Sequence, residues 1–269
     1  MKTKLLFVLL IPFGAGVVAA QKKGGVIMEH GSTILTVISN DSIWIASDSK
    51  VSVRNSESRK NKYAKGCKVF NYQNIHYSVS GTTRLQDPDT KGILFDADKE
   101  VLDIIKKGKP FVETFADCYK TMEHRLFEVY KPIINSCSDE DIHYLFDYHP
   151  VLLSISMSMF SDKNKPMYIY WAYKLEHTAK EWSIQPTLVD TCIECTANQI
   201  SLQGATDSIN TYLNKNPLAT ISNIGMRERL IDLINMQIAK DPAEIGLPIV
   251  VKVIYAKGNK WLTAHKSCE

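Results

Sequence analysis

Hydrophobic residues recur with two different periods along the chain, and the periods separate strands from helices. Between residues 151 and 160, apolar side chains alternate with Ser154, Ser156 and Ser158. A period of two is typical of a strand that buries one face. Between residues 111 and 130, apolar side chains recur every three or four positions, which predicts an amphipathic helix.

The same two periods predict two hairpins, two helices, four strands, two helices and two final strands. The predicted strands are 33–39, 42–47, 68–72, 75–80, 151–160, 167–173, 181–188, 198–203, 249–256 and 260–264. The predicted helices are 95–107, 111–130, 206–213 and 224–239. Charged residues 49–66 predict a loop, and polar residues 21–31 predict an irregular leader. Strand runs separated by helix runs indicate an α+β domain with antiparallel sheets.

The first twenty residues have the pattern of an export signal. Lys2 and Lys4 precede an apolar run, which ends in the small residues Val18-Ala19-Ala20. This pattern is typical of a signal peptide, and we expect cleavage before Gln21. The apolar run is shorter than the roughly 20 residues of a spanning helix, so a membrane anchor is the weaker reading. We therefore expect a periplasmic or extracellular protein with no membrane contact after cleavage.

Charge and composition exclude few functions beyond nucleic-acid binding. The chain has 32 basic and 29 acidic residues, and loss of Lys2 and Lys4 leaves 30 basic residues, a net charge of +1. This balance gives no electrostatic preference for nucleic acid or for an anionic membrane. A hydrophobic content of 45% is ordinary for a globular domain with a sizeable core.

Six cysteines in an exported chain favour disulfide bonds, but six cysteines allow 15 pairings. The spacing of Cys192 and Cys195 also occurs in redox and zinc motifs. No second ligand pair follows at a usual spacing, so we expect a local structural disulfide. The remaining cysteines are Cys67, Cys118, Cys137 and Cys268.

Short motifs at the ends of the predicted strands resemble those of a known family. Ser32 follows a glycine at the start of the first strand, and Asp48 ends the second strand 16 residues later. Lys68 opens the third strand, Gly81 follows the fourth, and Asp241 begins a loop before a late strand. The order and spacing resemble proteasome β subunits and the related bacterial ATP-dependent protease, which are N-terminal-nucleophile (Ntn) hydrolases. The resemblance implies a four-layer αββα sandwich with two antiparallel sheets over 32–269, after a leader at 21–31.

The resemblance also implies a chemistry. The side-chain oxygen of Ser32 would attack an amide carbonyl, and the amine of the same residue, freed by self-cleavage after Gly31, would take the proton. Lys68 would lie beside the Ser32 oxygen, Asp48 would hold Lys68, and the Gly81 N–H would donate to the oxyanion. We expect a peptide or amide substrate, a homo-oligomer, and no cofactor or metal.

The sequence departs from the family in ways that leave alternatives open. The nucleophile is serine instead of threonine, Gln203 occupies the place of a family serine, and residues 136–150 have no counterpart. A catalytically inactive domain that assembles or binds a partner is the main alternative. Thr33 and Cys67 are rival nucleophiles.

A second alternative is a metal-dependent hydrolase. Its candidate ligands are His143, Asp147 and His149, close to three acidic residues. Carboxylates and imidazoles can together bind a divalent metal, but this spacing matches no helical metal motif. A surface insertion is the simpler interpretation.

Overall fold

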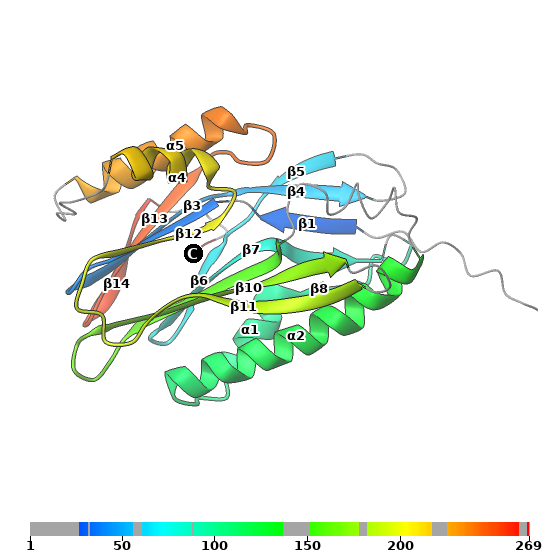
Figure 1. Ribbon diagram of the computed structural model, residues 1–269, viewed down its shortest axis with the longest axis horizontal. Helices are drawn as coiled ribbons and strands as arrows, with labels where there is room; N and C mark the ends of the chain where they lie inside the picture. Colours follow the sequence, from blue (N-terminus) through cyan, green and yellow to red (C-terminus); the bar gives the residue numbers. More distant parts are fainter. Residues whose placement is uncertain are drawn as a thin grey trace, which may run out of the picture.

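The computed structural model describes residues 27–31, 33–55, 61–87, 89–136, 151–177, 182–216, 225–263 and 268. The expected signal peptide, residue Ser32 and the candidate metal ligands lie outside the described residues. The described residues form two antiparallel sheets and four helices (Figure 1). The predicted α+β class with antiparallel sheets is therefore confirmed.

The larger sheet contains nine strands. Seven of them follow the order β11-β10-β9-β7-β1-β4-β5, and β6 and β8 also pair with β7. The strands are β1 (Ile27–Gly31), β4 (Lys50–Asn55), β5 (Asn61–Lys65), β6 (Val69–Tyr72), β7 (Ile75–Gln86), β8 (Ile93–Asp96), β9 (Val151–Phe160), β10 (Pro166–His177) and β11 (Trp182–Cys192). Two helices, α1 (Ala97–Ile105) and α2 (Phe111–Ser136), contact this sheet.

The smaller sheet contains five strands in the order β12-β2-β3-β13-β14. They are β2 (Thr33–Ile38), β3 (Ser42–Asp48), β12 (Gln199–Gly204), β13 (Ile249–Tyr255) and β14 (Gly258–Thr263). The helix α5 (Met226–Lys240) contacts β2, β3 and β13, and α4 (Asp207–Lys215) packs on α5. Figure 1 shows α4 and α5 on the opposite side of the molecule from α1 and α2.

The two faces of single strands belong to different hydrophobic clusters, because successive strand side chains point to opposite sides. On β10, Trp171 and Tyr173 pack with α1 and α2, whereas Tyr168 and Tyr170 belong to a cluster shared with β2 and β3. On β3, Trp44 packs with α5, whereas Ile45 belongs to the shared cluster. The shared cluster contains side chains from strands of both sheets, so the two sheets pack against each other there.

Three strands occur where a leader or a loop was predicted, and a fourth, β8, overlaps the start of the predicted helix 95–107. The expected leader contains β1, which pairs with β4 on one side and with β7 on the other, and its residue Met28 is fully buried. The predicted loop 49–66 contains β4 and β5, so the loop prediction was wrong. The strands β1, β4 and β5 are five or six residues long and contain charged residues, so their sequences show no clear alternation of apolar and polar side chains. Hydrogen bonds to distant segments stabilise them as strands despite that weak local signal.

Helix and strand ends also differ from the prediction. The predicted helix 111–130 continues to Ser136 and contains Pro132, and the predicted strand 75–80 continues through Gly81 to Gln86. The predicted helix 95–107 begins later, because Asp96 caps its first turn by accepting a hydrogen bond from the Lys99 N–H. No helix in the described part of the chain is both long and apolar enough to cross a membrane.

Candidate functional site

A buried ion pair joins the ends of two predicted strands. Lys68, just before β6, donates from Nζ to Oδ1 of Asp48 at the end of β3, over 2.9 Å. The side chain of Asp48 is 0% exposed and that of Lys68 is 1% exposed. Lys68 Nζ also donates to the backbone carbonyl of Lys50 over 2.6 Å. A buried charge is stable only when it is paired and hydrogen-bonded, and this ammonium group has both kinds of partner.

The carboxylate of Asp48 also accepts three backbone N–H groups. Oδ1 accepts the Thr33 N–H over 2.9 Å, and Oδ2 accepts the N–H groups of Lys50 at 3.1 Å and Gly246 at 3.2 Å. Asp48 therefore ties together the start of β2, the start of β4 and the loop before β13. The same oxygen, Oδ1, thus binds both Lys68 Nζ and the N–H of Thr33, the residue that follows Ser32 in the sequence.

Burial sets the protonation balance of Lys68. Loss of water around the ammonium group lowers the pKa of Lys68, and the nearby charge of Asp48 and its hydrogen bond oppose that change. The net direction is downward from the ordinary lysine value, so the proton of Lys68 is held less tightly than that of a surface lysine.

Gly81 lies opposite Gly31, the residue that precedes Ser32. The Cα register of β1 and β7 pairs Gly31 with Gly81, and β9 lies on the other side of β7. Gly81 has φ of 85°, and a Cβ atom there would lie 2.5 Å from the Leu152 carbonyl oxygen. Only glycine fits this position, because the conformation is left-handed and the neighbouring backbone is too close for a side chain. Gly81 thus lies across from the bond that self-cleavage would break.

The structure places both rival nucleophiles in other roles. Thr33 is 0% exposed, its hydroxyl donates to the Ala205 carbonyl over 2.5 Å, and its N–H binds Asp48. Cys67 is disulfide-bonded to Cys268 and has no free thiol. At the place of the family serine, Gln203 is buried and its Oε1 accepts a hydrogen bond from the Ser78 hydroxyl over 2.9 Å.

Asp241 is not brought to the ion pair. Its Oδ1 accepts the Glu244 N–H over 3.2 Å, and its carbonyl accepts the Ile245 N–H over 3.1 Å, so it closes the turn after α5. The contact from this loop to Asp48 comes from the Gly246 N–H instead. The sequence motif therefore identified the loop, while the residue that meets the site is five positions further on.

A cavity of about 340 Å³ lies beside Lys68. Its apolar lining comes from Val51, Phe70 and Val79. Its polar lining includes Glu29, Arg84, Asp96 and Asp98, and Arg84 forms an ion pair with Asp96 over 2.9 Å. The cavity is large enough for a side chain or a small ligand, and Lys68 is one of the residues that line it.

Two cysteine pairs are bonded in the described structure. Cys67 joins Cys268 across 201 residues of sequence, and Cys192 joins Cys195 in the turn after β11. The expected local bridge at Cys192 and Cys195 is therefore confirmed. Bonds of this kind are typical of oxidising compartments. Cys118 is free and buried, and burial raises its pKa to about 12, so its thiol stays protonated.

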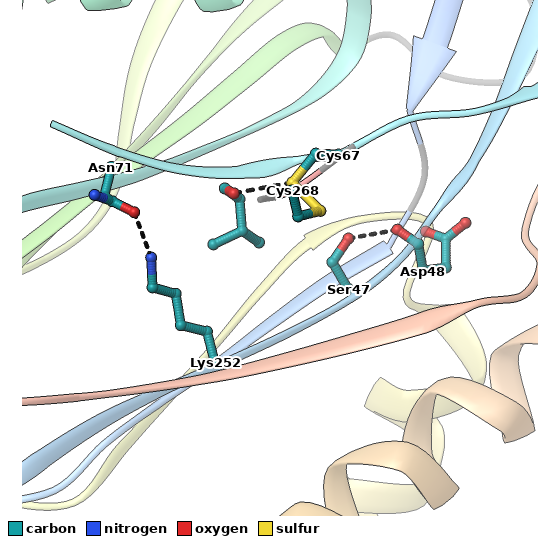
Figure 2. Close-up of a disulfide and its surroundings, with 7 residues drawn as sticks. Ser47, Asp48, Cys67, Asn71, Lys252 and Cys268 are labelled. Atoms are coloured by element: carbon teal, nitrogen blue, oxygen red, sulfur yellow. Dashed lines mark hydrogen bonds between the residues drawn. A yellow bond between two sulfur atoms is a disulfide. The ribbon is translucent and has the colours of Figure 1, made fainter. Parts of the chain in front are cut away.

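A second buried lysine lies on β13. Lys252 is 0% exposed, its Nζ donates to Asn71 Oδ1 over 2.6 Å, and Nζ lies 4.6 Å from the centre of the Trp261 ring. Burial lowers its pKa to about 8. His76, also buried, has its pKa lowered to about 3, first by burial and then by the charge of Lys252. Figure 2 shows Lys252 and Asn71 on one side of the Cys67–Cys268 bridge and Ser47 and Asp48 on the other.

Two contributors to the site carried no signal in the sequence. The Lys50 carbonyl and the Gly246 N–H act through the backbone, so the type of residue at these positions does not reveal the contact. Cys268 was one of six cysteines with no indication of its partner. Only the structure shows that it is bonded beside Lys68.

No protein-family model and no curated protein matches the sequence. Among solved structures, the chain is similar to Anbu (ancestral beta-subunit) from Yersinia bercovieri, with 11% sequence identity. That similarity covers 86% of this chain and 87% of the other, at a TM-score of 0.46.

Proposed function

We propose that the chain is an exported Ntn-type amide hydrolase, a peptidase or amidase, which cleaves itself between Gly31 and Ser32. In this proposal the two sheets and the helices form the αββα sandwich of that superfamily. One observation carries the proposal: the buried pair of Asp48 and Lys68 is bonded to the backbone of Thr33, directly after Ser32.

The pair suits the chemistry of an N-terminal serine. Once Gly31 is removed, the Ser32 amine has a pKa near 8 and can accept the hydroxyl proton as the oxygen attacks a carbonyl. A fixed positive charge at Lys68 favours the developing alkoxide and the neutral amine. Asp48 keeps that charge in place. The cavity beside Lys68 offers room for a substrate side chain, and the Gly81 N–H would donate to the oxyanion.

The N-terminal sequence and intact mass of the purified mature protein test the proposal. Self-cleavage gives a chain that starts at Ser32, and Ser32→Ala keeps the preceding segment. Cleavage of the signal peptide alone gives a chain that starts at Gln21. In that chain the Ser32 amine stays in a peptide bond and cannot act as a base, so an unvarying start at Gln21 excludes Ntn catalysis.

Two further variants test the roles of the ion pair. Lys68→Ala and Asp48→Ala should each block self-cleavage, and the double variant should lose no more than either single one, because one residue positions the other. Asp241→Asn is the matched control, since its carboxylate only closes a turn. Normal processing in Lys68→Ala would reduce the pair to a structural role.

One observation favours a second candidate function, a catalytically inactive domain that assembles or binds a partner. The segment before Ser32 is built into the sheet: β1 pairs on both sides, and Met28 lies in the core below α1 and α2. A leader that is removed by cleavage would be expected to bury fewer side chains and to form fewer backbone hydrogen bonds with the rest of the domain. The N-terminal sequence separates the two candidates, because the inactive domain keeps the bond between Gly31 and Ser32.

Export is part of the proposal and has its own support. The disulfides at Cys67–Cys268 and Cys192–Cys195 agree with an oxidising compartment, as does the signal-like start of the sequence. Thiol titration of the denatured protein tests this point. Two bridges leave two reactive thiols of six, whereas six reactive thiols would show that the protein matures in a reducing compartment.

A further inference from the structure

We propose that the Cys67–Cys268 bridge is a positioning element for Lys68, which fixes the short segment 66–68 so that the buried ammonium group stays against Asp48. The inference rests on the proposed function, because it concerns the same lysine. Neither cysteine of this bridge belongs to the catalytic residues that the sequence predicted, so the role of the bridge is new.

Besides the bonds of the Lys68 side chain, backbone hydrogen bonds hold the segment 66–68 at its two ends. It lies between β5 and β6 and belongs to neither strand. One backbone bond fixes each end: the Gly66 N–H donates to the Ser49 carbonyl over 2.9 Å, and the Val79 N–H donates to the Lys68 carbonyl over 3.1 Å. Between these two bonds stands Cys67, whose side chain is committed to the bridge.

The cavity explains why a covalent bond is useful at this place. Gly66, Cys67 and Lys68 all line the cavity of about 340 Å³, so side-chain packing is missing on that side of the segment. A segment beside open space keeps local freedom unless another bond removes it. The bridge ties it to Cys268, which lies between the strands that carry Asn71 and those that carry Asp48 and Lys252 (Figure 2).

The position of the Lys68 ammonium group depends on this segment. Two of its acceptors, Asp48 Oδ1 and the Lys50 carbonyl, lie at 2.9 and 2.6 Å and belong to another part of the chain. A shift of the segment by about 1 Å would stretch both bonds, and errors of this size in catalytic geometry can cost about 100-fold in rate. Loosening would also admit water to a group whose charge is now desolvated.

The second disulfide provides a matched control. Cys192 and Cys195 are three residues apart, and their bridge closes a turn between β11 and β12. That bridge includes none of the residues that line the cavity or hold Asp48. Cys192→Ala/Cys195→Ala therefore removes a disulfide without touching the segment of Lys68.

The experiment compares the wild-type protein, Cys67→Ala/Cys268→Ala and the control variant. Lysine labelled with ¹³C at Cε reports the titration of Lys68 by NMR, and Lys68→Arg identifies its signal. We expect a Lys68 signal that titrates below ordinary lysines in the wild type and in the control variant. In Cys67→Ala/Cys268→Ala the signal should move toward the ordinary lysine value, and self-cleavage should slow at least about tenfold.

Each outcome decides the proposal. An unchanged Lys68 signal in Cys67→Ala/Cys268→Ala overturns it, as does an equal change in both disulfide variants, which would indicate general destabilisation. If Cys67→Ala/Cys268→Ala fails to fold, Cys268→Ser alone, checked by circular dichroism, gives the same comparison. If the wild type does not cleave itself, the proposed function fails, and the NMR signal still decides whether the bridge positions Lys68.

Discussion

Two lysines are buried in the part of the chain that the structure describes, and their surroundings differ. Lys68 faces a carboxylate that is itself fully buried and held by three backbone N–H groups. Lys252 faces the amide oxygen of Asn71 and the Trp261 ring, and no ion pair of Lys252 occurs among the described residues. Where a buried lysine only fills space, an apolar residue of similar size would give a more stable fold, because it needs no desolvation of a charge. The charge of Lys68 is thus balanced by a buried carboxylate, as the proposed site requires, while the charge of Lys252 is met by an amide oxygen and an aromatic ring.

The largest effect should follow the loss of the carboxylate. Asp48→Ala leaves the Lys68 ammonium group buried without its carboxylate partner and removes the acceptor of three backbone N–H groups. Breaking a buried pair by removing one partner costs about 3–5 kcal/mol. Urea unfolding should show a loss of that size. Asp241→Asn, at a half-buried residue that closes a turn, should cost less than about 1 kcal/mol. A similar loss in both variants would contradict the special status of Asp48.

The opposite sign is expected at Lys252. Lys252→Met should raise the free energy of unfolding at pH 7 by about 1–2 kcal/mol, because the desolvation cost of the charge exceeds one hydrogen bond and one cation–π contact. Its folded pKa of about 8 lies below the unfolded value. The wild-type protein should therefore gain stability as the pH rises from about 8 to about 10.4, since over that range the unfolded state still binds the proton that the folded state has already released.

The Lys252→Met variant supplies the control for that pH profile. Without the titrating amine, the rise in stability between pH 8 and pH 10 should be flatter than in the wild type. Thermal unfolding at four or five pH values measures the difference. Parallel pH profiles, or a lower free energy of unfolding in the variant at pH 7, would contradict the prediction. They would mean that the contacts of Lys252 outweigh the cost of desolvating its charge.

The last prediction concerns the acid sensitivity of His76, which is buried near Lys252. Its folded pKa of about 3 lies below the ordinary value of 6.5, so acidification protonates the unfolded state first and lowers stability. Between pH 7 and pH 5 this group should remove about 1–2 kcal/mol. His76→Gln should lose less stability over that range. An equal loss in the variant would place the acid sensitivity at other groups.

The pairing of Lys68 could be predicted from the sequence, whereas the burial of Lys252 could not. The spacing of Asp48 and Lys68 led to their pairing through resemblance to a family, and the structure brings the two side chains together. Lys252 stands between Val251 and Val253, an alternation that predicts a solvent-facing lysine on a half-buried strand. The second sheet covers that face instead, and no local pattern reports a sheet contributed by distant residues.

Other differences have the same origin. The long helix α2 and the hairpin of β2 and β3 follow from local periodicity, and both were predicted near their observed bounds. The strand β1 depends on backbone bonds to β4 and β7, which lie 20 to 60 residues away along the chain. The bridge between Cys67 and Cys268 depends on the meeting of two segments 201 residues apart. Long-range contacts of these kinds leave no trace in a window of neighbouring residues.

The place of β1 inside the sheet has a consequence for association. If the segment before Ser32 were cut and lost, the facing sides of β4 and β7 would become two new sheet edges. Exposed edges present rows of N–H and C=O groups that template pairing with any extended chain. Loss of β1, a strand of five residues, would thus leave a gap between β4 and β7 that an extended foreign strand could fill. Retention of the cut segment would instead leave two chains that hold together without a covalent bond.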